Sequence, residues 1–175
     1  MKQAVVIVLF CLAGAIFANQ QASQILAGVN FLATKENEAG VFKLPSGMLF
    51  KVLMKGSGKK SPGPNDDCDV HYKGTLVTGA KFDSSYDRGS PATFKPTQVI
   101  KGWTEALQLM REGDKWEVYI PFNLAYGKEG RPPKIPGFSP LTFQMELIKV
   151  KGTGKPALQA SGDLKALIGK THDEL

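Results

Sequence analysis

The sequence predicts an α+β domain in which an antiparallel β-sheet packs against one amphipathic helix. Several segments alternate apolar and polar residues with a period of two, as strands do when one face of their sheet is buried. One internal segment, residues 97–110, instead carries its apolar residues at helical spacing. The chain has 175 residues, 42% of them hydrophobic, and can therefore bury a substantial core without metals or disulfides.

A first helix is expected over residues 21–38. Its apolar residues lie roughly on one helical face, and they are Ile25, Leu26, Val29, Phe31 and Leu32. The sequence NEAG at residues 37–40 ends it, since asparagine and glycine commonly close helices.

The strands are expected to follow this helix. They are predicted over residues 48–53, 68–77, 81–84, 115–120 and 141–148. Turn sequences separate them: PSG precedes the first strand, SPGPNDD at residues 61–67 forms a loop, and Thr78-Gly79 joins a hairpin.

The helix predicted over residues 97–110 supplies the other layer. Ile100, Trp103, Leu107 and Met110 are spaced by three, four and three residues and so form one apolar stripe. Residues 127–140 are rich in proline and glycine and predict a long, structured loop. Residues 152–175 are expected to form a tail with at most a weak helix around residues 164–168.

The N-terminus has the pattern of a cleaved secretory signal. Lys2 is followed by an apolar run at residues 4–17 and by small residues. This run is shorter than the ~20 residues of a membrane-spanning helix, which disfavours an uncleaved anchor. Cleavage is expected after Ala18, with Ala15 as the alternative.

The C-terminus ends in His172, Asp173, Glu174 and Leu175. This HDEL sequence is an address read by a retrieval receptor, and it is not an anchor. Together with the signal it predicts the lumen of the endoplasmic reticulum. Secretion is the alternative.

Composition argues against several other chemistries. The net charge of +6 is scattered along the chain, so a nucleic-acid interface is not expected. After removal of the signal, Cys68 is the one remaining cysteine, so no internal disulfide can form. Its side chain is expected to be buried and to pack as a small apolar group. His71 is expected to be a core histidine with its hydrogen bonds satisfied, and no metal site or cofactor is predicted.

Three blocks carry a resemblance to a known family. They are HYKGTLVTGAKFDSS at residues 71–85, VIKGWTEALQLM at residues 99–110 and LAYG at residues 124–127. In this order and spacing they resemble the FKBP-type peptidyl-prolyl cis-trans isomerases, from about Leu44 to Lys151. PATF at residues 91–94 and WEV-x-x-PFNLAYG at residues 116–127 are similar to the macrophage-infectivity-potentiator-like (Mip-like) subgroup.

The resemblance implies a twisted antiparallel half-barrel wrapped around one helix. The expected organisation is a signal peptide at 1–18, a helical segment at 19–43, the isomerase domain at 44–151 and a tail at 152–175. Residues 21–38 resemble the end of the helix that joins the two domains of Mip-like proteins. The longer dimerisation region of that subgroup is not seen here, so a monomer without a membrane span is expected.

The resemblance also implies a proline-binding pocket. Its members are Tyr72, Phe82, Asp83, Arg88, Val99, Ile100, Trp103, Tyr126, Ile135 and Phe143. Trp103 would form the floor, while the Ile100 N–H and the Tyr126 hydroxyl would bind carbonyl groups of the peptide or of a macrolide such as tacrolimus or rapamycin. The residues expected to act in catalysis are Phe82, Asp83, Trp103 and Tyr126.

Such a pocket suits a reaction in which no covalent bond is made or broken. X–Pro rotation has a barrier of ~18–20 kcal/mol, because amide resonance must be lost in the twisted state. A dry aromatic cavity favours that less polar state, so no cofactor is needed. Four residues depart from common family patterns and bear on substrate preference: Ala92, Gln98, Arg131 and Lys134.

Two functions of different class remain open at this point. One is an active isomerase that assists the folding of secretory proteins. The other is a non-catalytic chaperone or binding module that holds proline-containing segments in the same pocket. A secreted effector, as in some Mip-like proteins, is disfavoured by HDEL.

Overall fold

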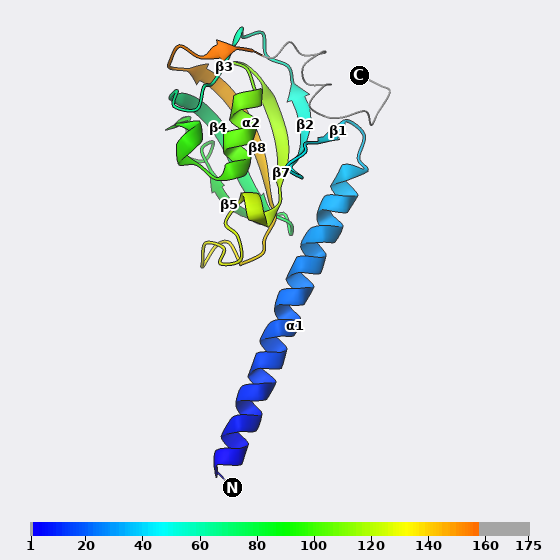
Figure 1. Cartoon of the computed structure of the whole chain (residues 1–175). Coiled ribbons are helices and arrows are strands. Elements are labelled where there is room, and N and C mark those ends of the chain that lie inside the picture. The colour runs from blue at the N-terminus through cyan, green and yellow to red at the C-terminus, as the bar shows by residue number, and fades with distance from the viewer. Residues whose placement is uncertain (1, 158–175) are drawn as a thin grey trace.

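An antiparallel sheet that curves around one short helix forms the body of the protein (Figure 1). The computed structural model describes the backbone of residues 2–157 and the side chains of residues 18–157. In chain order the elements are α1 (Lys2–Glu36), β1 (Val41–Lys43), β2 (Leu49–Met54), β3 (Lys60–Ser61), β4 (Cys68–Leu76), β5 (Lys81–Ser84), β6 (Ala92–Phe94), η1 (Pro96–Gln98), α2 (Lys101–Leu109), β7 (Lys115–Ile120), η2 (Phe122–Leu124), β8 (Leu141–Val150) and β9 (Lys155–Pro156).

The main sheet has the strand order β1-β2-β7-β8-β4-β5, with β6 also paired to β4. Every pairing is antiparallel, which confirms the predicted sheet. The five predicted strands are all present. The short strands β1, β3, β6 and β9 were not predicted, because two or three residues are too few to show an alternating pattern. The sheet thus begins at Val41, before the predicted domain start at residue 44.

The central strands β4 and β8 show why the predicted alternation is so regular. Inward residues of β4 are buried at Cys68, Val70 and Tyr72, and the residues between them are partly exposed. The register shifts by one residue where Asp69 pairs with Lys149 and Val70 pairs with Leu147. This β-bulge leaves Ile148 on the exposed side of β8.

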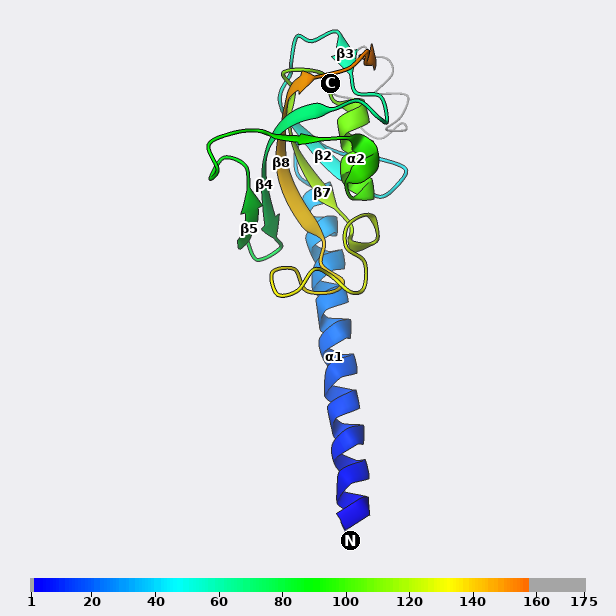
Figure 2. The same ribbon diagram turned by 90° about the vertical axis from the view of Figure 1, so that its left-hand side faces the viewer.

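Helix α2 covers the inner face of the sheet, as Figure 2 shows. Trp103, Leu107 and Met110 are buried, which confirms most of the predicted stripe. A Cβ atom on Gly102 would lie 2.5 Å from Cγ2 of Ile120, so the absence of a side chain lets the helix approach β7 closely. The predicted helix over residues 97–110 is interrupted, because Val99 is extended (φ −119°, ψ 176°) between η1 and α2.

Helix α1 differs most from the prediction. It runs without a break from Lys2 to Glu36, and its N-terminal half extends away from the sheet (Figure 1). Near its C-terminus Phe31 and Leu32 pack on a buried cluster of Val41, Leu49 and Tyr119, and the exposed fraction of Tyr119 is 1%. In β7, Tyr119 lies two residues after Glu117 and therefore on the same, outer face of the strand. At this position the outer face is nevertheless shielded from solvent, because α1 covers it.

Among the described residues, no helix is both long and apolar enough to cross a bilayer. Cys68 is fully buried, as predicted, and burial together with nearby Asp66 raises the pKa of its thiol to about 12. The weak helix predicted at residues 164–168 and the HDEL sequence lie outside the described residues.

Candidate functional site

A cavity of about 750 Å³ opens between the concave face of the sheet, the start of α2 and the loop at residues 127–140. It is lined by Tyr72, Phe82, Asp83, Phe94, Gln98, Val99, Ile100, Trp103, Tyr126, Arg131, Pro132, Pro133, Lys134, Ile135 and Phe143. All the pocket residues expected from the sequence are therefore brought together here, except Arg88. The lining contains no histidine, cysteine or serine.

Trp103 forms the floor of the cavity and is held by other aromatic rings. Its indole makes edge-on contacts, each at 83°, with Tyr72 (5.0 Å between ring centroids), Phe94 (5.4 Å) and Phe143 (5.2 Å). Edge-to-face packing of this kind fixes ring orientation as well as burying area. With an exposed fraction of 4%, the indole is a rigid apolar surface.

Phe82 and Phe143 form one wall, with ring centroids 5.5 Å apart at 86°. Gly74 lies behind them, paired with Asp83 on β5 and with Phe143 on β8. A Cβ atom at Gly74 would be 2.5 Å from Cζ of Phe82 and 2.8 Å from Cε1 of Phe143. The wall therefore requires a glycine at this position.

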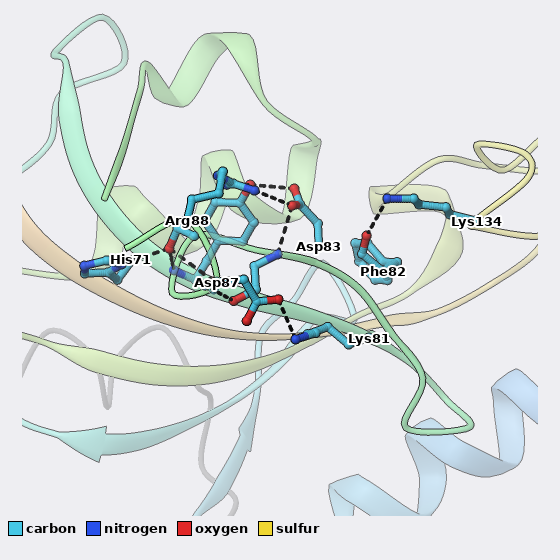
Figure 3. Close-up of polar contacts among 10 residues, drawn as sticks. His71, Lys81, Phe82, Asp83, Asp87, Arg88 and Lys134 are labelled. Carbon is cyan, nitrogen blue, oxygen red and sulfur yellow. Dashed lines mark hydrogen bonds and ion pairs between the residues drawn. The ribbon is translucent and has the colours of Figure 1, made fainter. Parts of the chain in front are cut away.

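The polar edge of the cavity is built around the carboxylate of Asp83. It accepts hydrogen bonds from the Tyr72 hydroxyl (2.6 Å), Arg88 Nη1 (2.6 Å) and the Ser84 N–H (2.9 Å), and Figure 3 shows Arg88 facing it. Burial alone would raise the pKa of Asp83, but the bonds from Tyr72 and Arg88 and the guanidinium charge hold it below its usual value. Burial, and then the bond to Asp83, raise the pKa of Tyr72.

Several donors on the lining have no protein acceptor in the described part of the chain. The indole Nε1–H of the buried Trp103 is one of them, and the Ile100 N–H and the Tyr126 hydroxyl are two others. The backbone N–H of Ile100 makes no hydrogen bond there, because Ile100 is extended (φ −60°, ψ 150°) just before α2. The Tyr126 hydroxyl likewise has no partner among residues 18–157, although the Tyr126 backbone is held in a turn by Gly130 N–H at 3.1 Å. The Ile100 N–H and the Tyr126 hydroxyl are therefore available to the carbonyl groups of a bound chain.

Sequence reasoning missed some of this lining and misplaced one residue. Phe94 touches Trp103 and lines the cavity, whereas Ala92 in the same strand does not. The PATF sequence contained this signal, since residues 92 and 94 lie on the same face of a strand. Arg88 does not line the cavity, and it reaches the site through Asp83 and Tyr72.

His71 lies on the opposite face of β4 from Tyr72, because successive strand residues point to opposite sides. Its Nδ1 is 2.9 Å from the Ser85 hydroxyl, and its ring stacks on Tyr86 at 4.6 Å and 9°. One ring nitrogen, Nδ1, therefore has a hydrogen-bond partner. The residue is only half-buried, however, so the prediction of a core position was wrong.

Comparison with known proteins agrees with this geometry. Residues 58–148 match the family described as FKBP-type peptidyl-prolyl cis-trans isomerase. The macrophage infectivity potentiator of Trypanosoma cruzi is 54% identical over 125 residues, which cover 71% of this chain and 64% of that protein. The chain spans about half to two thirds of the length of the curated relatives at the top of that comparison.

Two solved structures share the fold. A peptidyl-prolyl cis-trans isomerase from Pseudomonas syringae pv. tomato superposes with a TM-score of 0.70 at 40% identity, covering 75% of this chain and 96% of its own. FkpA from Escherichia coli superposes with a TM-score of 0.75 at 38% identity, covering 89% and 70%. The half-barrel around one helix is therefore this fold, with an N-terminal helix added.

Proposed function

The chain belongs to the FKBP-type peptidyl-prolyl cis-trans isomerase family, and from this premise we propose that it accelerates X–Pro isomerisation in folding polypeptides. The observation that supports the proposal most is the combination of a dry aromatic floor at Trp103 with two unpaired donors, Ile100 N–H and Tyr126 hydroxyl. The lining contains no serine, cysteine or histidine, and this reaction requires no nucleophile.

The reaction proceeds by stabilising the twisted imide relative to the planar one. The planar X–Pro bond is polar because of amide resonance, and uncatalysed exchange takes about tens to hundreds of seconds. The proline ring would rest on Trp103 between Phe82 and Phe143, where little water competes. The donors would hold the flanking carbonyl groups while the bond rotates, an interaction that lowers the barrier only if it strengthens in the twisted state.

A protease-coupled assay with a proline tetrapeptide tests this proposal, with tacrolimus or rapamycin as the competing ligand. We expect turnover that either macrolide inhibits, since both would occupy the same pocket. Macrolide binding without turnover would instead favour the binding module. Turnover insensitive to both macrolides would count against their binding at this site.

We further propose that the protein acts in the lumen of the endoplasmic reticulum on secretory clients. The support is in the sequence: a signal-like block at residues 1–18 and HDEL at residues 172–175. Deleting residues 172–175 should send the protein into the medium with its isomerase activity unchanged. Equal retention of the full and truncated chains would contradict this localisation, and the mass of the retained protein would distinguish cleavage after Ala18 from cleavage after Ala15.

We also propose that the mature protein is a monomer. Phe31 and Leu32 of α1 are used within the chain, packed against Tyr119, and so are not free to form an interface. Sedimentation at micromolar concentration should give the mass of one chain. A mass near two chains would contradict this.

A further inference from the structure

The mouth of the cavity carries an unbalanced positive charge. The charged residues of its lining are Asp83, Arg131 and Lys134. Asp83 is already neutralised by Arg88, whose Nη1 lies 2.6 Å from its carboxylate. Arg131 and Lys134 form no ion pair with a carboxylate among residues 18–157, so two positive charges remain.

These two cations stand beside the residues that would hold the peptide. Lys134 Nζ donates to the carbonyl of Phe82 at 3.3 Å, as Figure 3 shows, and so lies next to the aromatic wall. The guanidinium of Arg131 lies 5.8 Å from the centroid of the Tyr126 ring. A chain bound between Phe82 and Tyr126 would therefore have Lys134 near the Phe82 wall and Arg131 near the Tyr126 ring.

The backbone between the cations is restrained, which holds their positions. Pro132 and Pro133 separate them, and each proline ring fixes its own φ angle. Arg131 and Ile135 exchange two backbone hydrogen bonds of 2.8 and 3.1 Å across this turn. A carbon side chain at Gly130 would lie 2.4 Å from the Ile135 carbonyl oxygen, so the turn packs tightly.

We infer that Arg131 and Lys134 determine specificity, and that the site prefers X–Pro segments with an acidic side chain next to the proline. The inference rests on the proposed isomerase function and deepens it by naming a substrate class. Both cations are exposed, so each contact with a carboxylate is a surface ion pair. The expected preference is about two- to fivefold, the size that such pairs support.

The experiment compares tetrapeptides that differ only beside the proline, with Glu, Gln or Lys before it, and a second set with Glu or Gln after it. We expect kcat/KM to be highest for a Glu peptide in at least one set and lowest for the Lys peptide. Raising the salt concentration from about 0.1 M to 1 M shortens the screening length from roughly 10 Å to 3 Å and should abolish the difference.

Matched variants assign the effect to the two cations. In Arg131→Gln/Lys134→Gln the Glu and Gln peptides should be turned over equally. Lys128→Gln removes one positive charge from the same loop at an exposed residue outside the lining, so it should keep the preference.

If the Gln peptides are turned over and each Glu peptide is turned over at the same rate as the Gln peptide of its set, the inference is overturned. The isomerase proposal then stays intact. If no peptide is turned over, the isomerase proposal fails instead. The dissociation constants of the same peptides then decide the inference, because equal affinity for the Glu and Gln peptides would overturn it.

Discussion

The guanidinium of Arg88 binds the Asp83 carboxylate at 2.6 Å through Nη1, and its Nη2 donates to the Tyr72 hydroxyl at 2.7 Å. Arg88 therefore acts on the pocket from outside, as a positioning residue for two lining side chains. The resemblance had implied a direct contact with the bound peptide. A positioning role for Arg88 can be distinguished from direct peptide binding by the pH dependence of activity.

Arg88→Gln should move the acid limb of the pH–activity profile to higher pH. Without the guanidinium, the pKa of Asp83 returns toward its ordinary value of about 3.9. The measurement is kcat/KM between pH 3 and 6 at constant ionic strength. Lys81→Gln is the matched control, because Lys81 pairs with exposed Asp87 nearby, and it should leave the limb in place.

The wild-type protein should have a flat activity profile from about pH 5 to 9, since the lining contains no histidine or cysteine. Asp83 has a lowered pKa when folded, so its contribution to stability is present above about pH 4 and is lost as pH falls through the folded value. Tyr72, with a raised pKa, stays protonated throughout. A bell-shaped profile centred near neutral pH would show that another group titrates.

Tyr126→Phe should lower kcat/KM by about two- to twelvefold, as expected for one hydrogen bond of about 0.5–1.5 kcal/mol. The Tyr126 hydroxyl has no partner in the described chain, so the free energy of unfolding should barely change. Tyr86→Phe removes a hydroxyl that bonds Glu146 on the outer face and serves as the control. An equal loss of kcat/KM in both variants would contradict the role assigned to Tyr126.

Trp103→Leu should reduce turnover strongly while keeping the protein folded. Leucine retains apolar volume but not the flat indole that Tyr72, Phe94 and Phe143 orient. Trp103→Ala also empties the core beside α2, where such truncations cost about 3–5 kcal/mol. Peptide turnover and urea unfolding of both variants should be compared, and wild-type turnover in Trp103→Leu would exclude Trp103 as the pocket floor.

Gly74→Ala should lower activity by displacing both rings of the aromatic wall. The added methyl group would lie 2.5 Å from Cζ of the half-buried Phe82 and 2.8 Å from Cε1 of the buried Phe143. Gly102→Ala is the contrasting variant, since its methyl group meets Ile120 in the packed core and overpacking there costs about 1–3 kcal/mol. Unchanged turnover in Gly74→Ala would mean that the Phe82 wall is not needed.

The fold class, the main strands and most of the pocket lining could be predicted from the sequence alone. Period-two alternation in residues 68–77 and 141–148 is a local pattern, because it follows from one face of each strand being buried. The four-residue spacing of Trp103 and Leu107 is also a local pattern, because it follows from one face of α2 being buried. The motifs around Tyr72, Trp103 and Tyr126 were identified from their resemblance to the family, without knowledge of the three-dimensional structure.

Which of these residues contact one another depends on how the elements pack in three dimensions. Gly74 is needed because β4 lies between β5 and β8, and Tyr119 is buried because the C-terminal end of α1 packs on the outer face of β7. Arg88 lies outside the lining but reaches Asp83, five residues earlier, and Tyr72, sixteen residues earlier. Each of these relations depends on how separate elements pack, and short-range periodicity carries no information about distances between elements.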